Sequence, residues 1–408
     1  LVPHMSIGAF ADTDPRRPRA SGGEASGSAD LLEHRGAAGL RRCRRRHHHD
    51  PSLRSSGGGH RRPRGRIPTL VEKPAAVHTR QVKRMNEVAA AHPPDVPFAI
   101  MFNQRNNPLY QRIKAIVDAG EIGEVLRSTW IITTWWRPQA TTTSPTGAPP
   151  GGGEGGGVLV NQAPPHQLDL WQWICGAPEK VFAKAAFGFR RAIAVEDEVT
   201  ALVDYGDGRT GTFITATHDM NGTDRFEILG TAGKIIVEGS KTATVHRYAK
   251  PEKEVSDSVD IDGGARRLMS GDASVLEGLV TTETIEDSSA WGGAQHSGVL
   301  ENFARHVLFG EKLLAPPGSD GIVGVRLANA IHLSAWTGRE VPLDFDEDEY
   351  LAELNKRIVA EGEVPSAELR RIPPGPPGGS GGVPAGTPPD HPDGPPSERM
   401  RRRPGLSA

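Results

Sequence analysis

The chain has 408 residues, which is enough for two ordinary domains with extensions at both ends. Its 48 basic and 50 acidic residues nearly cancel, which excludes a global field that would attract nucleic acid or a membrane. No apolar run approaches the ~20 residues of a membrane span, and the first residues lack the layout of a signal peptide. The cysteines, Cys43 and Cys175, form neither a disulfide framework nor a metal-binding pair. We therefore expect a cytoplasmic protein without a metal, nucleic acid or membrane partner.

The first 68 residues carry little of the pattern of a folded domain. Residues 5–15, MSIGAFADTDP, predict a short strand that ends at the acidic Asp12. Residues 16–68 are rich in Arg, Gly, Ser and His and show neither the period of a strand nor that of a helix. This composition predicts a stretch that is not natively folded. The basic run at 41–49 could bind nucleic acid or a metal, but such runs are more often solvated surface.

Strands and helices alternate from Thr69 onward. A strand that ends in Glu72-Lys73-Pro74 is followed by predicted elements in the order helix, strand, helix, strand, at 77–92, 97–105, 107–125 and 126–136. This alternation is typical of a parallel α/β sheet. Ligands of such sheets bind beyond the carboxyl ends of the strands, where this sequence carries Glu72-Lys73 and Gln104-Arg105.

A second candidate for chemistry lies between Glu154 and Gly176, where glycines, a short apolar run and two prolines precede a predicted helix. On this helix His166 and Asp169 are three residues apart and share a face. A histidine in the first turn feels the positive end of the helix dipole, which favours a neutral, proton-accepting imidazole. His166 is therefore a candidate general base, and a capping or interfacial histidine is an equally good interpretation of this segment alone.

The pattern changes after Gly176. Successive strands with glycine-containing turns predict an antiparallel sheet, at 180–189, 198–217, 224–239 and 242–249. Helices are then predicted at 298–311, 321–339 and 347–360. Residues 365–408 consist mainly of Pro, Gly and Arg, which predicts a disordered tail.

Six sequence features occur in one order along the chain: EKPAA, QRNNPLY, GGGVLVNQ, the His-x-x-Asp helix, VEDEVTALVDYGDG and LANAIHLSAWTGREVPLDF. Together they resemble the Gfo/Idh/MocA family of nicotinamide-dependent oxidoreductases, over about 69–139 and 155–360. The resemblance implies an α/β Rossmann-type dinucleotide-binding domain, incomplete at its N-terminus, over 1–104. It implies a larger α+β domain with an open antiparallel sheet over 105–364, and a homodimer or homotetramer.

The resemblance also implies NAD or NADP as cofactor and hydride transfer from a sugar or cyclitol hydroxyl carbon. Lys73 would orient the reacting hydroxyl and stabilise the developing alkoxide, and His166 would take its proton. Asp169 would hold a neighbouring substrate hydroxyl. The implied cofactor contacts are Asp12, Glu72, Lys73, Gln104 and Arg105, and the implied substrate contacts are Asn161, Trp136 and Arg137.

Three features depart from the family pattern. No G-x-G-x-x-G phosphate turn precedes Asp12, so we expect the sequence to start after the first family strand. Asp12 favours NAD, whereas Arg16 and Arg17 would favour NADP. One additional proline separates Asn161 from His166. The low-complexity stretches at 16–68 and 139–153 have the spacing of folded segments but not their composition. Out-of-frame translation is one hypothesis for them; it fails if the other reading frames of the coding DNA show no strand pattern.

Two alternatives to a dehydrogenase remain open at this point. A lyase-like or glycosidase-like member of the same fold would oxidise its substrate transiently and recycle the NAD. A catalytically defective member would serve as a binding module, which the missing phosphate turn favours.

Overall fold

The computed structural model describes residues 67–93, 95–139, 157, 159, 164–286 and 294–363, and the backbone of three short strands before them. The chain divides into two units, Leu1–Val364 and Pro365–Ala408. The predicted disordered tail at 365–408 lies outside the described residues, as does most of 16–68. None of the helices in the described part of the chain is long and apolar enough to cross a membrane.

The N-terminal part contains short parallel strands. Strands β1 (Ala9–Ala11) and β2 (Ala29–Leu31) pair with each other. Strands β3 (Arg46–His48), β4 (Thr69–Val71) and β5 (Phe98–Ile100) form a second sheet in the order β3-β4-β5. Strands β2 and β3 lie inside residues 16–68, where the composition predicts no strand. Each of them pairs with a parallel neighbour, and this pairing, not the local composition, forms the strand.

Strands β4 and β5 are joined by helix α4 (Thr79–Ala90), which buries Val82 and Met85 against the sheet. Strand, helix and parallel strand form the predicted βαβ unit. After β5 the chain makes a short 3-10 turn, η1 (Asn103–Asn106), and then helix α5 (Pro108–Asp118). Asn107 caps α5, since its Oδ1 accepts from the Leu109 N–H at 2.8 Å, and Pro108 occupies the first helical position.

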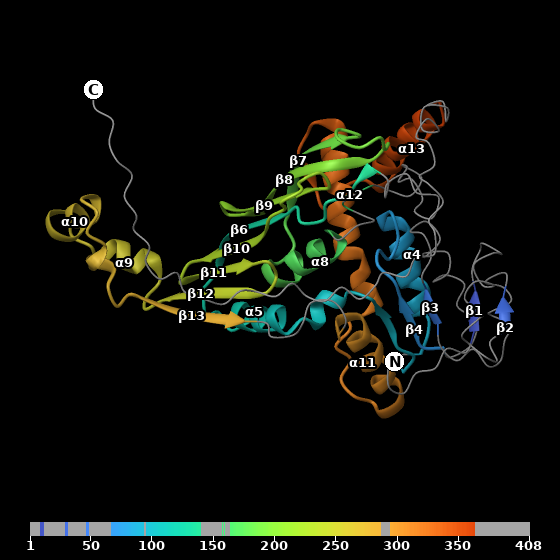
Figure 1. Cartoon of the computed structure of the whole chain (residues 1–408), viewed down its shortest axis with the longest axis horizontal. Helices are drawn as coiled ribbons and strands as arrows, with labels where there is room; N and C mark the ends of the chain where they lie inside the picture. Colours follow the sequence, from blue (N-terminus) through green and yellow to red (C-terminus); the bar gives the residue numbers. More distant parts are fainter. Residues whose placement is uncertain are drawn as a thin grey trace, which may run out of the picture. The chain divides into compact units, whose positions relative to one another are not determined.

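The second domain is built on a nine-stranded sheet in the order β13-β12-β11-β10-β6-β9-β8-β7-β14 (Figure 1). Its strands, in chain order, are β6 (Val125–Ile132), β7 (Lys180–Phe187), β8 (Glu196–Gly206), β9 (Arg209–Ala216), β10 (Asp224–Gly230), β11 (Gly233–Glu238), β12 (Thr242–Tyr248), β13 (Val280–Glu286) and β14 (Val341–Pro342). Neighbouring strands are antiparallel except β6 and β9, which are parallel. The predicted antiparallel sheet is therefore confirmed, with one parallel pair at its centre that was not predicted.

The predicted hairpin at Gly206–Gly208 is confirmed. Gly206 pairs with Arg209, and the two loop residues, Asp207 and Gly208, have φ of 53° and 81°. Positive φ at both positions is the type I′ geometry that suits the twist of antiparallel strands.

Helices cover one face of the nine-stranded sheet (Figure 1). The remaining helices are α8 (Pro164–Cys175), α9 (Glu252–Ser258), α10 (Arg266–Met269), α11 (Ala294–Phe309), α12 (Gly321–Thr337) and α13 (Glu347–Glu363). Short turns occur at η3 (Ile261–Ala265), η4 (Ala273–Leu276) and η5 (Gly318–Asp320). Helix α12 packs against β7 and α8, and α8 also packs against α5, η1 and β6. The segment 252–276 and strand β13 are elements that the sequence pattern did not predict.

The core lies between this helical layer and the sheet. Trp171 of α8 stacks on Phe213 of β9, with ring centroids 5.6 Å apart, and its indole N–H donates to Ser128 Oγ at 2.8 Å. Gly211 makes room for this ring, because an added Cβ would lie 2.7 Å from Trp171 Cζ2. Helix α8 is thereby fixed on the centre of the sheet.

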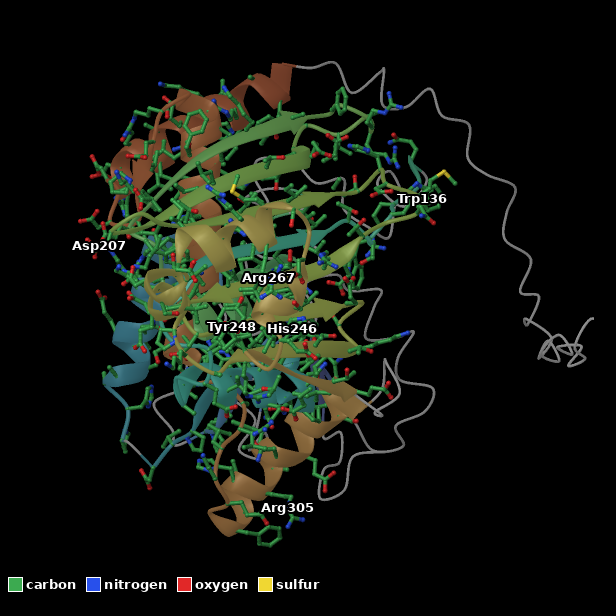
Figure 2. All side chains as sticks on the ribbon, turned by 90° about the vertical axis from the view of Figure 1, so that its left-hand side faces the viewer. Trp136, Asp207, His246, Tyr248, Arg267 and Arg305 are labelled. Atoms are coloured by element: carbon green, nitrogen blue, oxygen red, sulfur yellow. The ribbon has the colours of Figure 1, made fainter. Side chains whose placement is uncertain are left out.

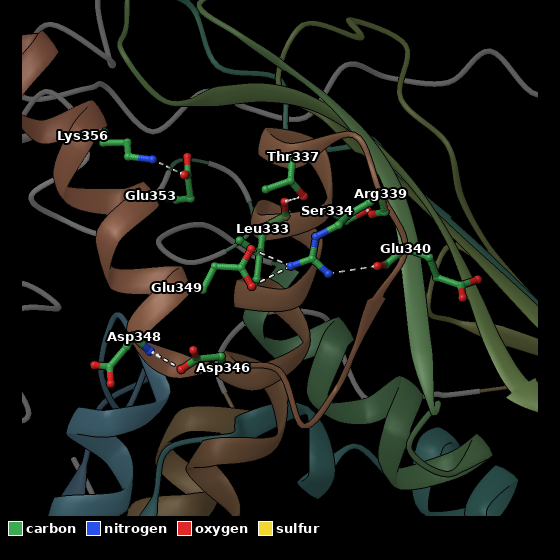
Figure 3. A network of polar contacts seen from close by, with 10 residues as sticks. All are labelled: Leu333, Ser334, Thr337, Arg339, Glu340, Asp346, Asp348, Glu349, Glu353 and Lys356. Carbon is green, nitrogen blue, oxygen red and sulfur yellow. Dashed lines mark hydrogen bonds and ion pairs between the residues drawn. The ribbon is translucent and has the colours of Figure 1, made fainter.

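Helix α12 ends in a polar network (Figure 3). Gly338 has φ of 68° and its N–H donates to Ser334 O at 2.8 Å, which closes the helix. Ser334 Oγ donates to Arg339 O at 2.6 Å and accepts from the Ala183 N–H at 2.9 Å. Arg339 in turn donates to both carboxylate oxygens of Glu349 at 2.6 Å. These contacts tie α12 to β7 on one side and α13 on the other.

Candidate active site

Three segments that the sequence singled out lie close together: the residues after β4, the turn η1 and helix α8. Lys73 follows the carboxyl end of β4, and η1, which carries Arg105, follows β5. Helix α8 carries His166 and packs against η1. The ring of His166 contacts Phe102, just before η1, edge-on with 6.2 Å between ring centroids. The rule that ligands bind at strand ends therefore selected residues that are neighbours in space.

His166 is held as a neutral imidazole. Only 9 % of the residue is exposed, and burial holds its pKa well below the usual 6.5, with further lowering by the positive charges of Lys73 and His296. Burial and nearby cations are thus the cause, where the sequence suggested the helix dipole. Among the described residues, its Nδ1 is enclosed without a hydrogen-bond partner, which leaves Nε2 as the nitrogen accessible to a substrate.

Lys73 is a cation whose charge is easily lost. Burial lowers the pKa of its ammonium to about 8; Glu72 opposes this effect, and Arg137 adds to it. At pH 7 the ammonium form still predominates. The charge of Lys73 lowers the pKa of His166, and the charge of Arg137 lowers the pKa of Lys73, which links these three predicted site residues electrostatically.

Arg105 and Asp169 are bound to each other, a pairing that the sequence did not predict. Arg105 Nε donates to Asp169 Oδ2 at 2.7 Å and Nη2 donates to Oδ1 at 2.5 Å. A third donor, Nη1, reaches Asp320 Oδ2 at 2.8 Å. Asp169 is 0 % exposed, and burial raises the pKa of its carboxyl to about 6, against the opposing effect of Arg105. The two side chains hold each other in place, and the predicted substrate contact of Asp169 and cofactor contact of Arg105 stay predictions.

The segment that leads into α8 is anchored by a buried carboxylate. The N–H groups of Gly157 and Leu159 donate to Glu196 Oε2 and Oε1, each at 2.9 Å. On its other side, Glu196 Oε1 lies 3.2 Å from His332 Nε2 of α12. Burial acts to raise the pKa of Glu196, but His332 and the two backbone N–H groups outweigh it and lower the pKa. Glu196 belongs to the VEDEV motif that the chain shares with the family it resembles, and the sequence alone predicts no role for it.

Arg137 and Trp136 follow the carboxyl end of β6. Figure 2 shows Trp136 at the opposite end of the sheet from the Asp207 hairpin. Trp136 is 39 % exposed, so its ring is available to a ligand. The Arg137 guanidinium lies over the ring of Trp135, 4.9 Å from its centroid. Their predicted role as substrate contacts stays a prediction, supported for Arg137 by its interaction with Lys73.

His296 of α11 is a site residue that sequence reasoning missed. The Asn103 amide nitrogen lies 3.3 Å from Nδ1 of His296, and the charge of a protonated His296 lowers the pKa of His166. No motif surrounds His296, so only the packing of α11 on η1 reveals it.

Three further residues were predicted as cofactor or substrate contacts: Asp12, Gln104 and Asn161. Asp12 and Asn161 lie outside the described residues. Gln104 lies in η1, beside Arg105. No group of His, Cys, Asp or Glu that could hold a metal ion occurs within the described ranges.

Comparison with known proteins matches residues 110–236 to the family model of the GFO/IDH/MocA C-terminal domain. The chain carries a Gfo/Idh/MocA C-terminal domain. The family resemblance is thereby confirmed for this part of the chain, which includes α8 and β6–β10 and part of β11. A comparison with curated protein sequences gives no significant match.

Solved structures resemble the fold of a larger part of the chain. The WlbA dehydrogenase from Bordetella pertussis, in complex with NADH and UDP-GlcNAcA, is 23 % identical over 84 % of this chain and 91 % of that chain, with a TM-score of 0.65. A levoglucosan dehydrogenase, in complex with NADH and levoglucosan, is 18 % identical over 82 % and 90 %, with a TM-score of 0.62. A putative myo-inositol dehydrogenase from Sinorhizobium meliloti 1021 is 18 % identical over 83 % and 92 %, with a TM-score of 0.58. These likenesses confirm the predicted fold class.

Proposed function

We propose that this chain is an NAD(P)-dependent oxidoreductase that transfers a hydride between a hydroxyl-bearing carbon of a sugar or cyclitol and a nicotinamide cofactor. The observation that carries the proposal is the neutral, buried imidazole of His166 beside the ammonium of Lys73. A base and a cation at one place are what oxidation of an alcohol requires. Neighbours of the same fold were solved with NADH and with UDP-GlcNAcA or levoglucosan, which supports the same ligand classes here.

The described residues fit the reacting end of such a cofactor. Lys73 follows the end of β4, and η1 follows the end of β5. The Nδ1 atom of His166 is enclosed and has no hydrogen-bond partner among the described residues, so it marks a polar position in a packed region. A bound nicotinamide would supply the hydride acceptor. Glu72, Lys73 and Gln104 would lie along it, and Asp12 would contact the adenosine ribose.

The protein's own part in the reaction is acid–base chemistry and orientation. Lys73 donates to the reacting oxygen and stabilises the negative charge that develops on it. His166 accepts the hydroxyl proton at Nε2, since the neutral form is favoured and Nδ1 is enclosed. Arg105 and Asp169 hold α8, and therefore His166, against η1. Asn161, Trp136 and Arg137 would contact the substrate.

Two measurements test the proposal. Titration of the full chain with NADH, followed by fluorescence, should show saturable binding. Absence of binding at millimolar nucleotide contradicts the proposal and favours the binding-module alternative. A panel of inositols, aldoses and anhydrosugars, followed by nicotinamide absorbance, should then identify the substrate. Product that accumulates without stoichiometric NADH would instead indicate a lyase or glycosidase that recycles its NAD.

We also propose a cytoplasmic homodimer or homotetramer that assembles through the sheet. Along β7, Val181 and Ala183 are buried toward the helices, whereas Phe182 between them is 37 % exposed on the other face. Leu202, its partner on β8, is 51 % exposed. Paired exposed apolar residues on a sheet suit a contact between copies. Light scattering should report a dimer or larger assembly, and Leu202→Glu should reduce it to a monomer.

A further inference from the structure

His332 lies on helix α12, is completely buried and faces a buried carboxylate. Its Nε2 lies 3.2 Å from Oε1 of Glu196, a residue whose side chain is only 1 % exposed. An ionised carboxylate only accepts hydrogen bonds, so a proton on Nε2 suits this contact. The Nδ1 of the same ring is enclosed and meets no hydrogen-bond partner within the described ranges. Glu196 is therefore the polar group to which the ring of His332 is directed.

The ring of His332 is held at this angle by a stack of aromatic rings. It stacks on Trp336, about one turn further along α12, with 5.2 Å between ring centroids and 12° between ring planes. Trp336 stacks in turn on Tyr350 of α13, at 5.5 Å and 25°. The Tyr350 hydroxyl accepts from the Asn329 amide of α12 at 3.0 Å. Rotation of the His332 ring would break the stack, so its Nε2 keeps one direction.

Glu196 transmits this fixed direction to the segment before α8. Its Oε2 accepts from the Gly157 N–H and its Oε1 from the Leu159 N–H, each at 2.9 Å. Because both oxygens are used, the carboxylate holds the two N–H groups in only one orientation of its plane. The helix that follows carries His166 in its first turn. The contact of His332 with Oε1 therefore fixes the plane on which the segment before α8 depends.

Helix α12 also approaches the start of α8 directly. A Cβ built on Gly324 would lie 3.5 Å from Pro165 O and 3.7 Å from Asp169 N, so the two helices pass close to each other there. Gly324 and His332 lie about two turns apart on α12. One helix thereby supports α8 at its first turn and, through Glu196, at the segment that leads into it.

We propose that His332 is a positioning residue: through Glu196 it fixes the start of helix α8 and thereby the ring of His166. Without a donor at position 332, Glu196 would be a buried carboxylate with one partner fewer. Such a group takes up a proton or turns away, and either change removes an acceptor from Gly157 or Leu159. The inference rests on the proposed function for the role of His166, and its test needs neither substrate nor cofactor.

Amide hydrogen exchange of the full chain measures this coupling. His332→Phe keeps a ring that can stack on Trp336 and removes the N–H that faces Glu196. Exchange at the Gly157 and Leu159 amides should become at least about tenfold faster, which is the effect of losing about one hydrogen bond.

A second measurement reports on His166 itself. Its ring resonances, identified by their absence in His166→Gln, should shift in NMR spectra of His332→Phe, because the ring takes a new position. Exchange at the Ile174 amide, near the other end of α8, should stay as in the parent protein. This combination separates a displaced helix start from general unfolding.

Two variants separate this role from a general loss of packing. His332→Gln keeps a donor within reach of Glu196 and should exchange within about threefold of the parent protein at the same two amides. Tyr350→Phe is the matched control, because it removes the hydroxyl that accepts from Asn329, a buried hydrogen bond of the same stack, and leaves the contacts of Glu196 in place. It should leave exchange at both amides unchanged.

The proposal is overturned if His332→Phe exchanges as the parent protein does at the two amides, if Tyr350→Phe accelerates them equally, or if the His166 resonances stay in place. If His332→Phe does not fold, His332→Asn repeats the test, since its amide is too short to reach Glu196 and that of His332→Gln is not. The expected exchange in a chain that does not bind NADH would contradict only the proposed function.

Discussion

The Arg105 guanidinium binds both carboxylate oxygens of Asp169, with N–O distances of 2.7 and 2.5 Å. One partner follows strand β5 and the other lies one helical turn after His166. Because Arg105 also binds Asp320, just before α12, a single buried cation joins three segments that are distant in sequence. The orientation of His166 therefore depends on a residue that need not contact the substrate.

Replacing Asp169 by Asn should lower the free energy of unfolding by about 3 kcal/mol, because removing one partner leaves a buried charge uncompensated. Urea denaturation of the full chain measures this value. Asp320→Asn is the control, since the Asp320 side chain is 35 % exposed and its loss should cost less than about 1 kcal/mol. Equal stability of Asp169→Asn and the parent protein would contradict the positioning role.

His166→Gln should reduce kcat at least about 100-fold, since a positioned general base contributes at least this factor. The Kd for NADH should stay within a factor of about two, because the change removes a proton acceptor and no cation. His246→Gln, on strand β12, is the control and should leave both constants unchanged; the ring of His246 bonds Thr282 on β13. If the His166→Gln variant keeps its activity, a residue other than His166 is the general base.

The rate of oxidation should depend on pH through Lys73. Its ammonium has a pKa of about 8, so kcat/KM should fall as pH rises above 8 and the cation is lost. Arg137 lowers this pKa, so Arg137→Gln should move the fall to higher pH. A pH profile of kcat/KM measured for both proteins checks the direction. A shift to lower pH would contradict the assignment.

Acid should destabilise the fold through His166. Its folded pKa lies well below 6.5, so the unfolded chain binds more protons and stability is lost as pH falls below 6.5. His296→Gln removes a cation that lowers this pKa, and the pKa of His166 should therefore rise. Histidine resonances in an NMR pH titration measure it directly. An unchanged titration would show that the two rings do not interact.

Gly157→Ala should lower both stability and kcat. An added Cβ would lie 2.3 Å from the backbone oxygen of Glu196, which cannot move without disturbing strand β8. Gly298→Ala in α11 is the control, because nothing lies within 4 Å of the added Cβ and Ala favours a helix. Thermal denaturation and kcat of both variants provide the comparison. If the two variants have equal stability and equal kcat, Gly157 does not help to anchor α8.

The sequence predicted Lys73 and Arg105 as neighbours because strand ends of a parallel sheet meet at one edge, and the family resemblance added His166. It could not pair Arg105 with Asp169, since the two are 64 residues apart and each alone is a plausible ligand contact. The same holds for Glu196, whose bonds to Gly157 and Leu159 span 39 and 37 residues. Local periodicity reports which face of an element is buried, and pairings between distant segments leave no local mark.

Strand β13 was missed for a different reason. Its sequence, VTTETIE, lies at the edge of the sheet and is largely exposed, so it lacks the apolar alternation of a half-buried strand. The parallel pairing of β6 with β9 was missed because successive strands with short turns normally pair antiparallel. In both cases the final partner in the sheet, and not the local sequence, decides the structure.

The parallel β6–β9 pair has a consequence for how the protein is made. Its register joins Arg127 to Thr210, and α8, β7 and β8 all lie in the chain between them. As the polypeptide leaves the ribosome, α8 appears before the strand that supplies Phe213 for Trp171 to pack on. The helix that carries His166 can therefore dock only after β9 has been synthesised and inserted beside β6. Assembly of the reaction centre is a late event of folding, since it depends on a contact between strands that are far apart in the sequence.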